Sequence, residues 1–88
     1  MSENHMRPIH PGEILKMDFL DVLDLKPCDL AATINIPVET INSLIARTSR
    51  ITTELAYRLS HALKTSPEFW LNLQNTYDIR LQKSLWKD

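Results

Sequence analysis

The side chains best suited to hold a ligand lie close together, between residues 38 and 50. Glu39 can accept a hydrogen bond from the amino group of cytosine, and Arg47 and Arg50 carry guanidinium groups that suit phosphate. The same stretch adds hydroxyl and amide groups from Thr40, Asn42 and Ser43. These groups favour contact with nucleic acid. The arginines can equally be solvated loop residues, and a carboxylate can equally repel DNA.

The element that must position these groups is a short helix from Pro37 to about Ala46. At about 100° per residue, its inward face is Ile41, Leu44 and Ile45 with Val38 at the margin, and its polar side chains point the other way. A second short helix, PCDLAATI, precedes it and begins at a proline, which a first helical position tolerates.

Three residues set the geometry between these two helices. Ala31 is small enough for a close approach, Asn35 tolerates the left-handed backbone of a tight corner, and Ile41 fills the space beneath. This spacing predicts a helix-turn-helix over about residues 27–46, whose second helix enters the DNA major groove. An ordinary helical hairpin in a bundle is the alternative.

The remaining pattern is helical as well. Pro11 begins a first helix whose inward face is predicted to be Ile14, Leu15, Phe19, Val22 and Leu23. Thr52 is a capping residue for a helix over about 53–64, with Leu55, Ala56, Leu59 and Leu63 facing inward. Ser66 with Pro67 predicts a C-terminal helix over about 67–84. No stretch has the pattern of a strand, so we expect an all-α fold of five helices: a flexible tail over 1–9, then one domain over 10–86.

The C-terminal helix carries two apolar stripes. The first should pack against the first and fourth helices, with Phe69 and Trp70 in the core rather than in a ligand site; it consists of Phe69, Trp70, Leu73, Tyr77 and Leu81. The second is predicted to face outward and consists of Leu71, Ile79 and Trp86. An outward apolar stripe favours a homodimer or a partner surface, because helix-turn-helix proteins span two half-sites as dimers. Scattered surface apolar residues are the alternative.

Composition excludes several classes of protein. The chain has 88 residues, a net charge of −1 and one cysteine, Cys28, which excludes an internal disulfide and a cysteine-rich zinc site. The histidines lack metal-ligand spacing, and there is no glycine-rich phosphate loop or nucleophile–base pair, so we expect no enzyme, metal or cofactor. We expect no membrane span or signal peptide, and hence a cytoplasmic protein. Local charge still suits DNA, because residues 47–64 hold four basic residues and one acidic residue.

Four segments resemble the HigA (VapI-type) antitoxins of the Cro/C1-type (XRE) helix-turn-helix superfamily. They are HPGEIL from His10, LAATINIPVETINSLI from Leu30, RITTELAYRLSHAL from Arg50 and TSPEFWLNLQNTYDI from Thr65. The resemblance spans about residues 10–79 and implies a five-helix lambda-repressor-like DNA-binding domain. It also implies a dimer on a palindromic operator, repression of its own operon and neutralisation of a HigB-type ribonuclease toxin. The operator-reading residues that it implies are Val38, Glu39, Asn42 and Ser43, with Arg47 nearby.

This chain departs from the family pattern at four positions. Pro37 stands where a capping serine or threonine is usual, and Pro27 stands where a polar residue usually contacts phosphate. Asn35 and Arg47 each stand where glycine is usual. The prolines remove hydrogen-bond donors, whereas Arg47 adds a charge for phosphate.

Three functions therefore compete. The first is an antitoxin that represses its own operon and binds a toxin. The second is a stand-alone helix-turn-helix transcriptional regulator without a toxin partner, which the gene beside this one would distinguish. The third, which the acidic first half and the two prolines favour, is a protein-interaction module that no longer binds DNA.

Overall fold

All secondary structure in residues 8–86, the part of the chain that the computed structural model describes, is helical. The first helical segment is continuous and consists of α2 (Pro11–Ile14), the π-helical turn η1 (Leu15–Leu20) and α3 (Asp21–Leu23). It is followed by α4 (Pro27–Ile34), α5 (Val38–Ile45), α6 (Thr53–Leu63) and α7 (Pro67–Trp86). With the first segment counted as one helix, the described residues form five helices and no strand, which confirms the predicted all-α fold.

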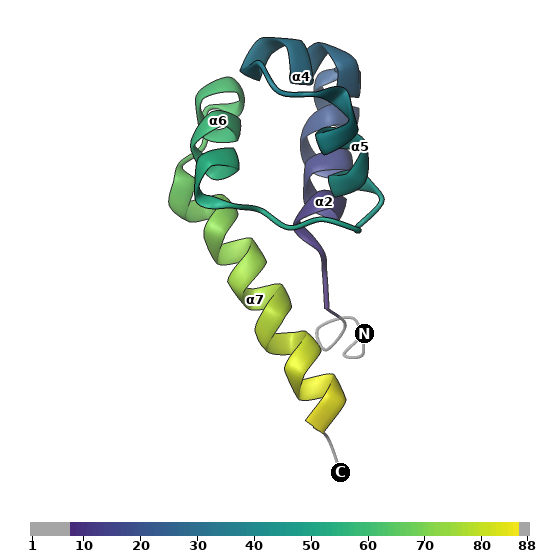
Figure 1. Ribbon diagram of the computed structural model, residues 1–88, viewed down its shortest axis with the longest axis vertical. Coiled ribbons are helices and arrows are strands. Elements are labelled where there is room, and N and C mark those ends of the chain that lie inside the picture. The colour runs from purple at the N-terminus through teal and green to yellow at the C-terminus, as the bar shows by residue number, and fades with distance from the viewer. Residues whose placement is uncertain (1–7, 87–88) are drawn as a thin grey trace.

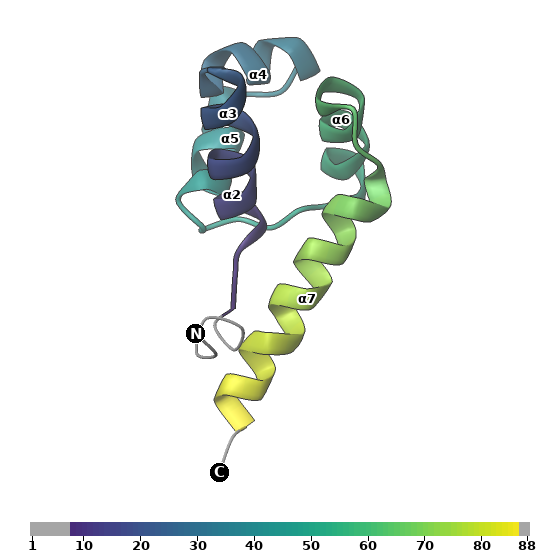
Figure 2. The ribbon, with the colours of Figure 1, turned by 180° about the vertical axis from the view of Figure 1, so that it is seen from behind.

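The helices form a body from which α7 extends (Figure 1). α4 lies across one end, with the first helical segment and α5 side by side on one flank and α6 on the other (Figures 1 and 2). α7 begins against α6 and continues beyond the body, so the molecule measures 45 × 25 × 22 Å. The second half of α7 therefore has less of the body beside it than the first half.

Three helices begin with a side-chain cap. The hydroxyls of Thr52 and Ser66 each accept a hydrogen bond from the backbone N–H three residues later, at 3.2 and 3.1 Å. These caps confirm the predicted starts of α6 and α7. α2 begins with a cap that the sequence did not predict, in which the His10 ring accepts a hydrogen bond from the backbone N–H of Gly12 at 2.9 Å.

Four helix ends share one geometry. A left-handed residue lies one or two positions after the helix, and the next backbone N–H donates to the carbonyl five residues earlier. This is the Schellman motif, in which glycine is the usual left-handed residue. The chain has a single glycine and uses other residues at all four ends: Asp24, Asn35, Arg47 and Lys64, with φ between 55° and 67°.

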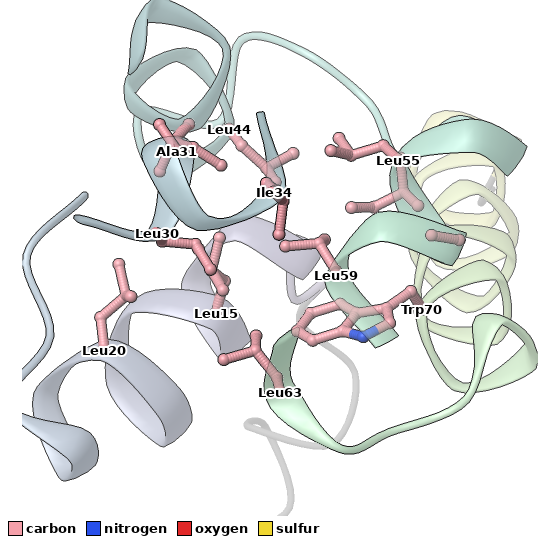
Figure 3. Packing of buried hydrophobic residues seen from close by; sticks show 13 residues of the cluster. Leu15, Leu20, Leu30, Ala31, Ile34, Leu44, Leu55, Leu59, Leu63 and Trp70 are labelled. Carbon is pink, nitrogen blue, oxygen red and sulfur yellow. The ribbon is translucent and has the colours of Figure 1, made fainter. Parts of the chain in front are cut away.

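The core lies between the first helical segment, α4, α5, α6 and the start of α7 (Figure 3). Trp70, Leu15 and Leu59 are fully buried at its centre. The predicted inward residues that are buried are Leu15, Ala31, Ile41, Leu44, Leu55, Ala56, Leu59, Leu63 and Trp70. The structure confirms the predicted inner faces of α5 and α6, with Ile45 and Val38 half-buried at the margin.

The prediction for the inner face of the first helix was wrong at its end. Val22 and Leu23 are exposed, whereas Leu20 is buried beside Leu15. The cause is the π-helical turn η1, which brings residues five apart onto one face instead of residues three and four apart. The 2.6 Å contact between Lys16 and Asp21 shows this spacing directly.

The prediction for α7 was also wrong in part. Of the inner stripe, Trp70 is buried and Leu73 and Tyr77 are half-buried, but Phe69 and Leu81 are 36% and 39% exposed. Leu71, predicted to face outward, is instead half-buried against the core. Helical spacing predicts which residues of α7 share a face. It does not predict how much of that face α6 and α2 cover, and this decides which of its residues are buried.

Candidate nucleic-acid interface

The α4–α5 pair has the predicted corner. Asn35 is left-handed at φ 61° and ψ 50°, and the next N–H, that of Ile36, donates to the carbonyl of Ala31 at 3.0 Å. Ala31 is 3% exposed and Ile41 is fully buried. A short helix, a tight left-handed corner and a second short helix over a shared core form a helix-turn-helix.

The outer face of α5 presents the predicted polar groups. Glu39 and Asn42 are exposed, and Thr40 and Ser43 are half-buried. Val38, also predicted to contact DNA, packs partly against the core and exposes only part of its side chain. The structure therefore brings four of these five residues to one polar surface and places Val38 at its edge.

The helix-turn-helix begins both of its helices without a side-chain cap. Lys26 precedes α4 and Pro37 precedes α5, and neither side chain makes a capping hydrogen bond. This agrees with the loss of donors and caps expected at Pro27 and Pro37. The first backbone N–H groups of each helix thus have no partner from a capping side chain.

Arg47 closes the end of α5. It adopts the left-handed conformation at φ 67°, as expected for a position where glycine is usual, and its N–H donates to Leu44 at 3.0 Å. Its guanidinium lies 3.7 Å from the carboxylate of Glu13. Arg47 thus remains near α5, with an acidic group beside it.

Arg50 points towards α7 instead. Its two terminal nitrogens donate to the two carboxylate oxygens of Asp78 at 3.3 and 2.9 Å. These hydrogen bonds raise the pKa of Arg50 and lower the pKa of Asp78. The sequence did not predict this pair, because 28 residues separate its members.

Arg58 was not among the predicted site residues. It donates twice to Glu54 of its own helix, at 3.2 and 2.9 Å, and once to the carbonyl of Ile34 at the end of α4, at 2.8 Å. All three arginines of the segment 47–64 therefore lie beside carboxylates. The positive charge counted from the sequence is largely compensated in the fold.

A surface cavity of about 460 Å³ lies where α5 and α6 begin. Ile36, Pro37 and Leu55 give it apolar surface, beside two arginines. The lining residues are Ile36, Pro37, Thr40, Ser49, Arg50, Thr52, Glu54, Leu55 and Arg58. The cavity thus borders the polar face of α5.

His10 and Gly12 join the first helix to this region, and neither was predicted to do so. A Cβ on Gly12 would lie 1.7 Å from the carbonyl oxygen of Leu44, so only glycine allows α2 to approach α5. The His10 ring is 4.9 Å from that of Tyr77, edge to face, and hydrogen bonds with the backbone of Ser49. Burial lowers the pKa of His10. The only glycine of the chain, at the second position of the predicted first helix, is the signal that could have identified this contact.

The described residues form neither a cluster of metal ligands nor a helix that could cross a membrane. No group of three or more histidine, cysteine, aspartate or glutamate side chains within residues 8–86 could hold a metal ion. Among the helices of that same range, none is both long enough and apolar enough to cross a membrane. Fold and surface together define a helix-turn-helix DNA-binding protein.

Known proteins agree with this class. No protein-family model matches the sequence. A helix-turn-helix-type transcriptional regulator of Haemophilus influenzae is 41% identical over 86 residues, which cover 90% of this chain and 80% of that protein. Antitoxin HigA-1 of Vibrio cholerae is 34% identical over 79 residues, which cover 90% of this chain and 74% of that protein. The Pseudomonas aeruginosa antitoxin HigA, solved with the higBA promoter, superimposes with a TM-score of 0.86 at 37% identity, over 90% of this chain and 86% of that one.

The chain belongs to the HigA (VapI-type) family of helix-turn-helix antitoxins and regulators. It is a DNA-binding regulator and not an enzyme.

Proposed function

We propose that this chain is the antitoxin of a type II toxin–antitoxin module, which represses its own operon and neutralises a HigB-type ribonuclease toxin. The observation that carries the proposal is the superposition, over 90% of the chain, on a HigA antitoxin solved with a promoter. The relatives are bacterial proteins, and a bacterial repressor meets its operator in the cytoplasm, so the proposal includes a cytoplasmic location.

The proposed operator contacts lie on the outer face of α5. Glu39 and Asn42 are exposed and can reach base edges, with Thr40 and Ser43 beside them and Val38 at the edge. Arg47 would contact phosphate, in competition with Glu13 at 3.7 Å. The uncapped start of α5 would add backbone N–H groups for a phosphate oxygen, whereas Pro27 supplies none at the start of α4.

The proposed homodimer uses the part of α7 that extends from the body. Ile79 and Leu85 are 49% and 72% exposed, and Leu81 lies on the same half of the helix. Ile79 keeps the outward position that the sequence predicted, whereas the side chain of Trp86 lies outside the described part of the structure and Leu71 packs against the core. Exposed apolar side chains on this half of α7 suit contact with a second copy of the chain.

The dimer is tested by solution mass. Ile79→Lys combined with Leu85→Glu should give a monomer with weakened operator binding, while Asn75→Lys combined with Ser84→Glu makes the same charge changes at exposed polar sites and should remain dimeric. A double apolar variant of unchanged mass and operator affinity would exclude this half of α7 as the dimer surface.

The toxin is tested by co-expression with the protein encoded beside this chain's gene. Growth arrest by that protein alone, relieved by this chain, supports the antitoxin function.

The second candidate is a stand-alone regulator, which the 41% identity to a helix-turn-helix-type transcriptional regulator favours. Growth unaffected by the neighbouring protein, together with retained operator binding, would decide for that candidate.

A further inference from the structure

The loop from Ala46 to Thr52, which joins α5 to α6, is bound to α7 through its backbone. The N–H of Ile51 donates to the side-chain oxygen of Gln74 at 2.8 Å. Gln74 is only 4% exposed, and its amide nitrogen donates in turn to Asp78 at 3.0 Å. A buried glutamine with both ends of its amide engaged has a defined orientation, so it holds Ile51 in one place.

Asp78 holds the preceding part of the same loop. Both of its oxygens accept hydrogen bonds from Arg50, and one of them also accepts from Gln74. The parallel bonds of an arginine–carboxylate pair fix direction as well as distance. A DNA phosphate that approached the same edge of the guanidinium would compete with Asp78 for these two donors, so the geometry favours a structural use of this arginine.

The loop matters because it follows directly from the DNA-contacting face. α5 packs against α4 and α2, whereas α7 packs against α6 and α2. Side-chain bonds from α7 to residues 50 and 51 therefore join the end of α5 to the helix that carries the proposed dimer surface. Ile79, on that surface, is the neighbour of Asp78 in the chain.

We propose that Gln74 and Asp78 are positioning residues for operator binding, and that Arg50 serves as their loop-side partner and not as a phosphate contact. The inference deepens the proposed function and rests on it. It makes DNA binding depend on two α7 side chains that lie outside the helix-turn-helix. It also replaces the role that the sequence suggested for Arg50.

The test is a double-mutant cycle in the full-length chain. The probe is a fluorescein-labelled duplex that spans the DNA directly upstream of the chain's own gene, and anisotropy gives the Kd over a series of salt concentrations. The variants are Arg50→Ala, Asp78→Ala, the two combined, and the charge exchange of Arg50→Asp with Asp78→Arg. Asp21→Ala is the matched control, because it removes the exposed Lys16–Asp21 ion pair of the first helical segment.

A positioning role has a defined outcome. Each single variant should bind roughly tenfold more weakly, the combined variant should be no weaker than either one, and the salt slope should stay as in the parent. The charge exchange should recover part of the affinity, and Asp21→Ala should bind normally. Gln74→Ala should weaken binding and speed hydrogen exchange at the Ile51 amide, which loses its acceptor.

A phosphate contact would give the opposite pattern and overturn the inference. Arg50→Ala would then lower the salt slope by about one charge, and Asp78→Ala would tighten binding by removing a competing carboxylate. If Asp78→Ala does not fold, Asp78→Asn supplies the comparison, since it keeps an oxygen acceptor at that place. A parent chain that does not bind the duplex would refute the proposed function itself, whereas a binding parent with unaffected variants refutes only the positioning role.

Discussion

The helices of the helix-turn-helix begin differently from the helices around it. His10, Thr52 and Ser66 cap α2, α6 and α7 with side-chain hydrogen bonds, whereas α4 and α5 have no such bond at their starts. The surrounding helices thus each satisfy an early N–H group with a side chain, whereas no side chain does so at the starts of α4 and α5. We call α2, α6 and α7 the frame. The difference indicates that capping hydrogen bonds stabilise the helices of the frame more than they stabilise α4 and α5.

The largest effect is expected where the frame meets α5. Gly12→Ala should cost about 3 kcal/mol or more, because its Cβ would lie 1.7 Å from a backbone oxygen that cannot rotate away. Thermal or urea unfolding measures the loss. Asp18→Ala, at an exposed position of the same helical segment, should change stability by less than about 0.5 kcal/mol. Equal stabilities of the two variants would mean that α2 and α5 are not in contact here.

A smaller loss is expected inside the helix-turn-helix. Ala31→Leu should destabilise the fold by roughly 1–3 kcal/mol, because Ala31 is 3% exposed at the contact of α4 with α5. Ala32→Leu is the matched control, since the adjacent alanine is exposed. Urea unfolding of both variants distinguishes close packing from a general intolerance of α4 to leucine, which would make the two changes equally costly.

Changes of the caps sharpen the comparison between the two regions. Thr52→Ala removes a cap from the frame and should cost about 1 kcal/mol, whereas Lys26→Ser adds a cap to α4 and should stabilise by about 0.5–1 kcal/mol. Lys26 already has the extended backbone of a capping residue, at φ −81° and ψ 150°. The denaturant midpoints of the two variants show which change lowers stability and which raises it. A Lys26→Ser variant no more stable than the parent would show that α4 gains nothing from a side-chain cap.

The smallest expected effect is a pH dependence of stability that arises from His10, the cap of α2. Burial lowers the pKa of His10, and its ring nitrogen must be unprotonated to accept from Gly12. The unfolded chain takes up this proton near pH 6.5, about its ordinary value, and the folded chain only at lower pH. Stability should therefore be complete above about pH 6.5 and fall as the pH drops through the folded pKa.

His10→Asn provides the control for this pH dependence. Asparagine can cap the helix without titrating, so the variant should lose that part of the pH dependence. Unfolding free energies measured between neutral and mildly acidic pH make the comparison. A slope unchanged by His10→Asn would assign the titration to other groups.

Much of this fold was predictable from local patterns, because caps, prolines and helical spacing act within a few residues. Thr52 and Ser66 predicted two helix starts, and Asn35 predicted the corner. The π-helical turn was not predictable from spacing, and it moved Val22 and Leu23 to the surface. The Arg50–Asp78 and Gln74–Ile51 bonds join residues 28 and 23 apart, so only the packing of α7 reveals them.

The exposed face of α5 was predictable as a surface but not as an electrostatic environment. Helical spacing alone placed Glu39 and Asn42 outward. The positive charge counted along residues 47–64 took no account of Glu13, Glu54 and Asp78, which lie beside its arginines. Two of these three acidic groups come from other parts of the chain, and their positions depend on tertiary packing.

The most direct test of DNA binding through α5 compares two duplexes at one stated salt concentration. The first is the DNA upstream of the chain's own gene, and the second is a scrambled duplex of equal length and composition. The parent should prefer its own DNA by roughly a thousandfold or more. Asn42→Ala should lose about 1–3 kcal/mol on that DNA and nothing on the scrambled duplex. Equal affinity of the parent for both duplexes, or an Asn42→Ala variant as selective as the parent, would contradict the account.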